Sequence, residues 1–454
     1  MTRLLLSRRE ALQILARSGA ASVLGGGSFA AIASALPRPG ILPSPYLIGA
    51  PVDTHDDIQL LDDIERASFL FFWEQMNPKT GIVKDRSLAS GDPDARVVGS
   101  IGATAFGLTA MCIGAMRGYI DSAAARDRVL AGLRFYWNNL QHQHGFFYHF
   151  VNFETGERYV NFKSEVSSID TALLMCGVLT CRQYFQDPEI HDLAGKIYDR
   201  AEWPWLLQNG KLASHGWVPE TGFIPFSWSS YSEMMAIYLL GLGSSTHPFP
   251  PETWHAWNRP NFQYEGIKYI GTFAPLFAHQ FTHAWFDFRG RRDQYCDYFV
   301  NSALATEAHR LYCLSLAKEF PDFSENLWGV TASDSQKGYQ IWGGPPEVGH
   351  LDGTIAPCAA GGSVAFLPQA SLPVLRNIKT RYEKEAWTRY GFVDAFNPLT
   401  RWYDTDVIGI DTGVTMLMAE NARSRFVWNT FMKNPEAQKG MEVAGLKEYP
   451  AEYS

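Results

Sequence analysis

Hydrophobic residues recur every three to four positions over most of this chain, which is the spacing of one face of an α-helix. Strand-like alternation is short and confined to the connections between these runs. The pattern predicts an all-α protein with short β-hairpins in its loops. The predicted helices cover residues 58–76, 102–118, 122–141, 165–185, 188–208, 229–242, 272–287, 292–319, 368–389 and 406–434, the last broken in two.

The connections share a glycine that precedes hydrophobic or aromatic residues, at Gly81, Gly145, Gly216, Gly329 and Gly391. The intervals are 64, 71, 113 and 62 residues, and the third, close to twice the others, indicates one diverged copy near 279–290. A period of about sixty residues is two helices and a loop, and six such units fill the chain. The repeat predicts an (α/α)6 toroid, a double ring of inner and outer helices. An open helical solenoid is the alternative, but it does not need loops so long and aromatic at one end.

The first 36 residues have the composition of an export signal. Arg8 and Arg9 follow Ser7, an apolar Gly/Ala-rich stretch comes next, and small residues suited to cleavage lie at 33–35. This twin-arginine pattern predicts a periplasmic or secreted protein. An N-terminal membrane anchor is the weaker alternative, because three consecutive glycines interrupt the stretch. We expect an export signal at 1–36, a Pro/Gly-rich linker at 37–57, one catalytic toroidal domain at 58–445 and a C-terminal tail at 446–454.

Charge and composition narrow the class of partner. The 454 residues carry a net charge of −8, and removing the leader, which holds four Arg and one Glu, leaves −11. An acidic chain of this kind argues against nucleic acid as partner. No second run of some eighteen apolar residues occurs, so we expect no membrane contact after signal removal. The six cysteines form no C-x-x-C pair, and spacing leaves both disulfide pairing and oligomeric state open.

Three predicted helix entries combine aromatic and acidic residues. They carry Glu165 and Asp170; Trp228, Tyr231 and Glu233; and Trp402, Asp404 and Asp406. The spacing from Asp170 to Glu233 is 63 residues, and from Glu233 to Asp406 it is 173, nearly three repeats. Because the inner helices of a toroid run parallel, we expect these acids to converge at one end of the ring.

Converging carboxyl groups are what glycoside hydrolysis requires: one acid protonates the leaving oxygen and one carboxylate acts as base or nucleophile. Aromatic faces beside them can stack on sugar rings. The candidates for catalysis are Glu233, Asp406, Asp170 and Asp404. Glu233 also has a structural explanation, since Ser230-x-x-Glu233 fits a helix capping box.

Other segments offer further polar and aromatic groups. The long loop 325–346 carries Trp328, Asp334 and Trp342, and we interpret it as a cleft wall. His283, Trp285 and Arg289 are candidate sugar contacts, although core packing and surface charge explain them equally well. Asp85, Asp352 and Asp394 are expected to be turn residues.

Two metal patterns are weak. His279, His283 and Asp287 share one face of a predicted helix, but the H-E-x-x-H form of a zinc site is missing. Asp404, Asp406 and Asp411 lack the glycine and terminal glutamate of a calcium-binding EF-hand loop. We therefore expect neither a metal nor another cofactor.

Ordered segments along residues 58–445, among them "FFWEQMNPKTGIVKDRS", "SSIDTALLMCGVL", "YSEMMAIYLLGLGSSTHP", "HQFTHAWFDFRGRRD", "GYQIWGGPP" and "YGFVDAFNP", resemble the glucoamylase-like domain family. That family includes bacterial endo-β-1,2-glucanases of glycoside hydrolase family 144. The resemblance implies an (α/α)6 barrel, secretion, and metal-free hydrolysis of β-1,2-glucans or sophoro-oligosaccharides. It also implies that Glu233 is the acid and that the base is among Asp406, Asp404, Asp170 and Glu165. A polysaccharide lyase, a glucan transglycosylase and a glycan-binding protein without turnover are the alternatives.

Overall fold

The computed structural model describes residues 48–271 and 275–450. The expected export signal, 1–36, lies outside the described residues, as does most of the linker that precedes the domain. Helix α2 starts at His55, a few residues before the predicted start of regular structure. Within the described part of the chain, no helix combines the length and apolar character needed to cross a bilayer.

The inner ring is built from segments that are buried on nearly every side. In α3 and α5 the first fourteen or fifteen residues are all buried, as expected for helices that are apolar all round. The inner segments, in chain order, are α3 (Ile101–Arg117), α5 (Ser168–Tyr184), α7 (Met235–Gly243), the 3₁₀ turns η3 (Leu276–His279) and η4 (Thr282–Ala284), α10 (Pro357–Gly361) and α13 (Gly409–Ser424).

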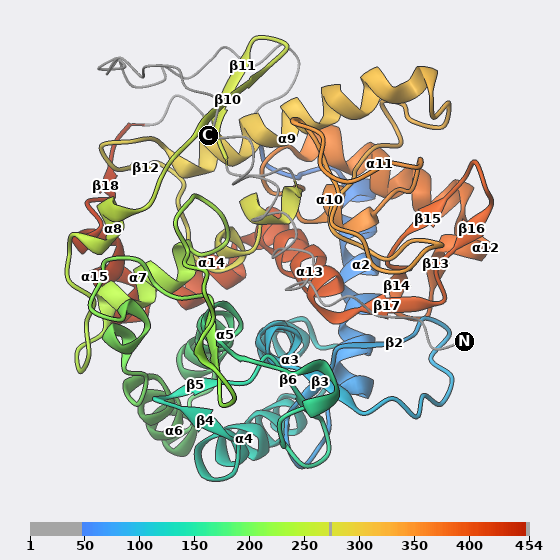
Figure 1. Ribbon diagram of the computed structural model, residues 1–454. Coiled ribbons are helices and arrows are strands. Elements are labelled where there is room, and N and C mark those ends of the chain that lie inside the picture. The colour runs from blue at the N-terminus through green and yellow to red at the C-terminus, as the bar shows by residue number, and fades with distance from the viewer. Residues whose placement is uncertain (1–47, 272–274, 451–454) are drawn as a thin grey trace.

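Most of the outer helices are amphipathic, whereas α9 is buried along most of its length. Helix α6 buries Ile190, Leu193, Ala194 and Ile197 at helical spacing and exposes its other face. Figure 1 shows α3, α5 and α13 toward the middle of the molecule and α4, α6, α9 and α11 around them. The outer helices are α2 (His55–Gln75), α4 (Ser122–Asn138), α6 (Pro188–Asp199), α9 (Tyr298–Ser315) and α11 (Pro368–Arg381), and α15 (Pro435–Val443) packs against α7. This arrangement is the predicted (α/α)6 toroid.

Shorter elements complete the connections. They are α8 (Thr253–Ala256), α12 (Glu383–Ala386), α14 (Phe426–Phe431), η1 (Val160–Phe162), η2 (Trp203–Leu207) and η5 (Leu316–Lys318). The strands are β1 (Val83–Lys84), β2 (Arg86–Leu88), β3 (Val98–Ser100), β4 (His142–Gln143), β5 (Phe146–Phe147), β6 (Phe150–Asn152), β7 (Val166–Ser167), β8 (Gly216–Val218), β9 (Gly222–Phe223), β10 (Asn261–Tyr264), β11 (Ile267–Ile270), β12 (Arg291–Arg292), β13 (Trp387–Thr388), β14 (Gly391–Phe392), β15 (Phe396–Asn397), β16 (Trp402–Tyr403), β17 (Asp406–Ile408) and β18 (Lys447–Glu448). All these strands are short, as predicted.

Four of the five repeated glycines have a backbone conformation that L-residues rarely adopt. Gly81, Gly145, Gly329 and Gly391 have φ between 67° and 127°, the region that glycine enters without a steric penalty. At Gly145 an added Cβ atom would also lie 2.5 Å from the carbonyl oxygen of Arg200. The repeated glycine therefore marks a turn in four of the five loops, whereas Gly216 lies in β8.

Several predicted helices differ from the structure. The predicted helix 272–287 is wrong in its described part, which holds only η3 and η4. Helix α7 starts at Met235 rather than at 229, because residues 229–231 form backbone hydrogen bonds with Asn258. The remaining differences are that α6 ends at Asp199, α9 covers only 298–315, α11 ends at Arg381, residues 406–408 form β17, and the expected tail contributes β18, which pairs with β12.

The segments that enter the inner helices are joined to one another around one end of the ring, called here the entry rim. Most of these contacts are backbone pairs between neighbouring loops. In order, they join 86–88 to 406–408, 98–100 to 150–152, His149 to Glu165, 166–167 to 216–217, Ser168 to Trp228, Glu233 to Thr282, Phe277 to Thr331, Gly329 to Ala356, and Asp394 to Asp406. Together these contacts form a closed ring of neighbouring loops, so the acids spaced one repeat apart do lie on one rim.

Candidate active site

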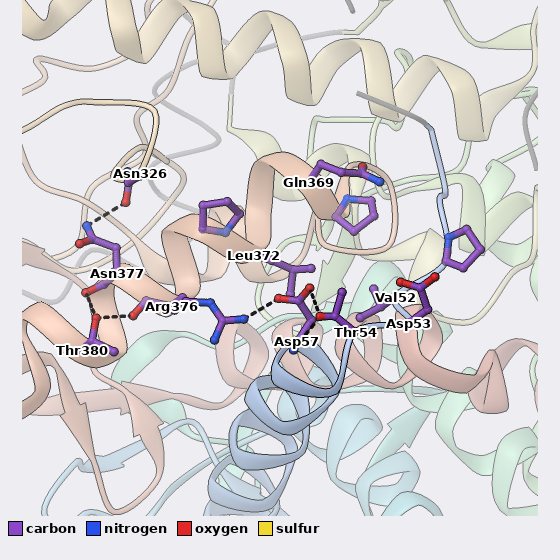
Figure 2. A pocket seen from close by; sticks show the side chains of 13 residues that line it. Val52, Asp53, Thr54, Asp57, Asn326, Gln369, Leu372, Arg376, Asn377 and Thr380 are labelled. Atoms are coloured by element: carbon purple, nitrogen blue, oxygen red, sulfur yellow. Dashed lines mark hydrogen bonds and ion pairs between the residues drawn. The ribbon is translucent and has the colours of Figure 1, made fainter. Parts of the chain in front are cut away.

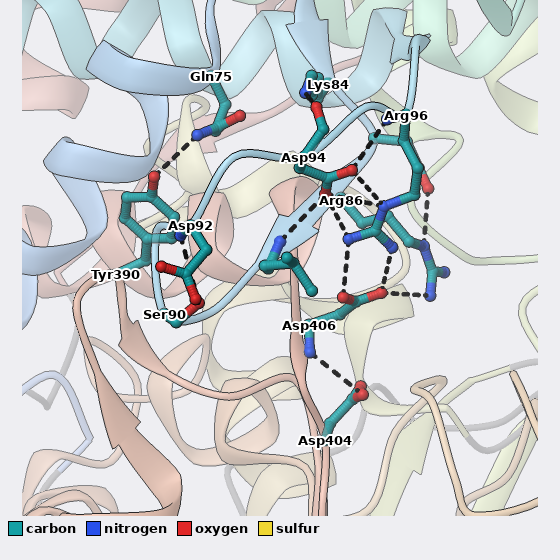
Figure 3. A network of polar contacts seen from close by, with 12 residues as sticks. Gln75, Lys84, Arg86, Ser90, Asp92, Asp94, Arg96, Tyr390, Asp404 and Asp406 are labelled. Carbon is teal, nitrogen blue, oxygen red and sulfur yellow. Dashed lines mark hydrogen bonds and ion pairs between the residues drawn. The ribbon is translucent and has the colours of Figure 1, made fainter.

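Asp406 is the centre of an ion-pair network on the entry rim (Figure 3). It lies in β17, directly before inner helix α13, and its side chain is 11% exposed. Arg96 forms a bidentate ion pair with it, at 2.5 and 2.8 Å, and also contacts Asp94. Arg86 lies 3.8 Å from Asp406. Paired guanidinium donors of this kind fix both the charge and the orientation of a carboxylate.

Asp404 lies two residues earlier and has a different environment. Burial, together with the charges of Asp334 and Asp406, raises the pKa of Asp404 to about 8. Asp394, on a neighbouring loop, is also buried, and burial together with Asp411 and Asp334 raises the pKa of Asp394 well above its usual value. The rim therefore holds a carboxyl group paired with two guanidinium groups beside carboxyl groups whose pKa is raised by burial, which is a common feature of catalytic sites.

Asp170 has a structural partner. Ser167 caps helix α5: its hydroxyl accepts from the backbone N–H of Asp170 and donates to the Asp170 carboxylate, at 3.2 and 2.6 Å. His149 lies 3.6 Å from Asp170 and 3.4 Å from Glu165. Gly102 leaves room for this carboxylate, because an added Cβ atom would lie 2.6 Å from its oxygen. Ser167 and Asp170 therefore occupy the positions expected of Ser230 and Glu233, although the Asp170 carboxylate accepts from the Ser167 hydroxyl and not from a backbone N–H.

Glu233 does not cap a helix. The N-cap of α7 is Met234, and no side chain makes a capping hydrogen bond there. The hydroxyl of Thr282 donates to the backbone carbonyl of Glu233 at 2.7 Å, which ties the start of α7 to the next inner segment. Glu233 is 1% exposed. The capping explanation of this buried acid is therefore wrong, and a carboxyl group is rarely buried without a specific role.

The predicted aromatic contacts fall into two groups. Tyr231, Trp285 and Trp328 have no exposed surface; Trp285, for example, donates to Thr109 in the middle of α3. Their packing in the core does not favour a contact with sugar. Trp402 is partly exposed in β16, while Trp228 and Trp342 are nearly buried and donate to Ser168 and Ser333.

The segment 279–289 does not form the expected polar face. His283 packs among aromatic rings with Ser302 at 3.0 Å, and burial lowers the pKa of both His279 and His283 to about 3. Asp287 is bound by Arg289, whose guanidinium stacks on Trp428 beyond the far end of α13. Since α13 is about 20 Å long, Arg289 lies at the opposite end of the ring from the acids, and its predicted sugar contact is not supported.

A groove of about 570 Å³ lies between the first turn of α2 and the outer face of α11 (Figure 2). Arg376 bridges it by an ion pair with Asp57, and Asn377 donates to the carbonyl of Asn326. None of its 13 described lining residues is aromatic. Asp57 is about 27 Å from the other end of α2, so the groove is separate from the acidic network.

Sequence reasoning missed several groups of this network. Arg86 and Arg96 carried no recognisable motif, and Asp394 was expected to be a turn residue, yet it lies beside Asp334 and Asp404. The partners in these contacts are separated by 60 to 310 residues in sequence, so no local pattern could have paired them. All six cysteines are free and buried, although Cys112 and Cys181 lie 3.7 Å apart.

Known proteins resemble this chain in sequence and in fold. Residues 225–435 match the family model described as putative glucoamylase. Among curated proteins, the chain is 28% identical over 424 residues to an exo beta-1,2-glucooligosaccharide sophorohydrolase of Parabacteroides distasonis, covering 85% of this chain and 58% of that protein's length.

Two solved structures share the fold over nearly their full length. An endo-beta-1,2-glucanase from Chitinophaga pinensis, in complex with sophorotriose and glucose, is 26% identical, with a TM-score of 0.81 over 86% of this chain and 99% of that chain. A putative glucoamylase from Bacteroides caccae is 28% identical, with a TM-score of 0.81 over 87% and 100%. These matches confirm the resemblance to the glucoamylase-like family and the toroidal fold.

Proposed function

We propose that this glucoamylase-like protein is an exported glycoside hydrolase that cleaves β-1,2-linked glucan or sophoro-oligosaccharides. The observation that carries the proposal is the collection of acids from four separate loops on one rim of a toroid. The toroid itself matches a β-1,2-glucanase over 99% of that chain. The similarity to a sophorohydrolase over most of this chain supports the same linkage.

Glu233 is the proposed proton donor. It directly precedes an inner helix, it is buried, and it has no capping role there. A general acid must deliver its proton to the glycosidic oxygen as the bond breaks. Glu233 is only 1% exposed, and a buried acid favours an enclosed complex that excludes bulk water from the reacting groups.

Asp406 is the proposed base. A base has to be ionised, and Asp406 is held as a carboxylate by the bidentate contact with Arg96. In the proposed reaction this carboxylate takes a proton from the attacking water while Glu233 protonates the leaving sugar. Asp170 is bound by Ser167, the N-cap of α5, and Trp402 offers a partly exposed ring at the same rim.

The proposal is tested by incubating the protein with linear glucans that differ only in linkage, β-1,2, β-1,3, β-1,4, β-1,6 and α-1,4, and by measuring new reducing ends. We expect release from the β-1,2 polymer or its oligosaccharides and little from the others. Binding without release would identify a glycan-binding protein. An ultraviolet-absorbing unsaturated product from a uronic acid polysaccharide offered in parallel would identify a lyase, and longer products from the glucans would identify a transglycosylase.

Export rests on the sequence of the leader. Replacing Arg8 and Arg9 by lysine should keep the protein in the cytoplasm, because the twin-arginine pathway reads that pair. Cell fractionation of the wild-type and variant chains measures this directly. Equal periplasmic amounts of both would contradict export by this route.

A further inference from the structure

Three carboxyl groups from three separate rim segments lie together beside Asp406. Asp334 lies in the loop between α9 and α10, Asp394 follows β14, and Asp404 precedes β17. One oxygen of each lies within 4.8 Å of one oxygen of each of the others. The three residues are 7%, 5% and 8% exposed, so the cluster is enclosed by protein.

In each of these carboxyl groups one oxygen is held by the protein and the other has no hydrogen-bond partner. Arg86 binds Oδ2 of Asp334 at 2.5 Å, the backbone N–H of Asp334 donates to Oδ2 of Asp394 at 2.7 Å, and the N–H of Asp406 donates to Oδ1 of Asp404 at 3.3 Å. The remaining oxygens, Oδ1 of Asp334, Oδ1 of Asp394 and Oδ2 of Asp404, are buried without a hydrogen-bond partner. Buried polar atoms normally have such partners, because leaving them unpaired is costly.

The charges around the cluster do not balance. Arg86 contacts Asp334 and Asp85, whereas the guanidinium of Arg96 is shared by Asp94 and Asp406. Asp411 adds a further acid that acts on Asp394. Several like charges in an enclosed space require either bound protons or a bound cation.

We propose that Asp334, Asp394 and Asp404 bind a divalent cation of the size of calcium. Their donors are hard carboxylate oxygens, and three groups each fixed through the second oxygen resemble ligands oriented by surrounding hydrogen bonds. Calcium takes six to eight oxygens at about 2.3–2.6 Å in a flexible geometry, so oxygens up to about 5 Å apart can share it, and the three oxygens lie within 4.8 Å of one another. Magnesium usually keeps several waters and is held by one or two carboxylates, so an enclosed site with three carboxylates favours calcium.

Such an ion would join the loops that carry residues 334, 394 and 404, and so would fix the segment that ends in Asp406. It would act as a positioning element and takes no part in bond cleavage. This inference goes beyond the proposed function and does not depend on it, since cation binding can be measured without any glucan.

The test is equilibrium dialysis of the chelator-treated protein against calcium alone and magnesium alone, with thermal denaturation in chelator and in calcium. We expect about one calcium per chain, weaker binding of magnesium, and a melting temperature that rises with calcium. Asp394→Asn should weaken calcium binding at least about tenfold, since a first-coordination ligand loses its charge. Asp127→Asn, which removes an exposed acid, is the matched control and should bind as the wild type does.

Thermal denaturation in chelator distinguishes a cluster balanced by a bound cation from one balanced by bound protons. Removing one charge relieves the repulsion, so Asp394→Asn should melt at or above the wild-type temperature in chelator but should gain nothing from calcium. If the wild type binds no calcium and melts at the same temperature with and without it, protons alone balance the cluster and the proposal is wrong. Should Asp394→Asn fail to fold, Asp404→Asn provides the same comparison, and unchanged calcium binding in that variant would equally overturn the proposal.

Discussion

Replacing Asp170 by asparagine separates a structural acid from a catalytic one on the same rim. The substitution keeps the shape of the side chain, which matters because Gly102 packs against it, and removes only its charge. In the structure this charge accepts the Ser167 hydroxyl at 2.6 Å in the first turn of α5. We therefore expect a loss of stability with little effect on turnover.

The size of the loss follows from the contacts. A hydrogen bond to a charged group contributes about 1 kcal/mol more than a neutral one, and a carboxylate in the first turn of a helix adds about 0.3–1 kcal/mol. The sum is about 1–2 kcal/mol. Unfolding entropy of about 2 cal/mol/K per residue makes about 1 kcal/mol equivalent to 1 °C for a chain of this length, so the melting temperature should fall by about 1–2 °C.

The assay is thermal denaturation together with initial rates on β-1,2-glucan. Turnover by Asp170→Asn should stay within about tenfold of the wild type, because neither reacting proton passes through Asp170. Ser167→Ala is the matched control and should cause a similar loss of stability. A loss of turnover above about a thousandfold with an unchanged melting temperature would show that Asp170 is the base and that our assignment of Asp406 is mistaken.

Two further predictions concern the far end of the ring and the rim. Burial and the neighbouring Glu420 raise the pKa of Glu65 well above its usual value. The folded state therefore binds a proton more tightly than the unfolded state, and this proton stabilises the fold at low pH. The stabilisation falls by about 1.4 kcal/mol per pH unit as the pH rises from about 4.5 toward the folded-state pKa. Denaturation between pH 5 and 7 should therefore show a shallower decline for Glu65→Gln, and an unchanged decline would contradict the effect of burial. At the rim, Trp402→Ala should raise KM roughly five- to thirtyfold with kcat retained, since a lost stacking contact is worth about 1–2 kcal/mol, whereas Trp285→Ala should lower stability by about 3–5 kcal/mol. Michaelis–Menten kinetics with thermal denaturation measure both, and a KM effect confined to Trp285→Ala would refute this division.

The global fold was predictable because it depends on periods that any single sequence displays. Helical spacing and a glycine repeated about every sixty residues were enough to predict a toroid, and four of these glycines have positive φ. Ring closure then placed the acids on one rim. The helical spacing and the glycine turns recur in most repeats, so an error in one predicted helix does not alter the predicted fold.

The details that failed depend on contacts between distant segments. The segment 275–284 is apolar enough for a helix, but the Gln280 side chain donates to Ala359 in α10 and to Ser363 just after it, and the segment forms only 3₁₀ turns. The start of α7 was displaced by pairing with Asn258, which also removed the expected cap at Glu233. Likewise, the environment of Asp406 depends on Arg96, 310 residues away, and no periodicity reports such a contact.

The release of reducing ends from linear β-1,2-glucan, by the wild type and by Glu233→Gln side by side, tests the central claim most directly. We expect turnover by the wild type and a loss of roughly a hundred- to ten-thousandfold in the variant, the usual contribution of a general acid, with the melting temperature preserved. No release by the wild type, or a variant within a factor of about two of it, would contradict the assignment of this rim as a glucan-cleaving site with Glu233 as its acid.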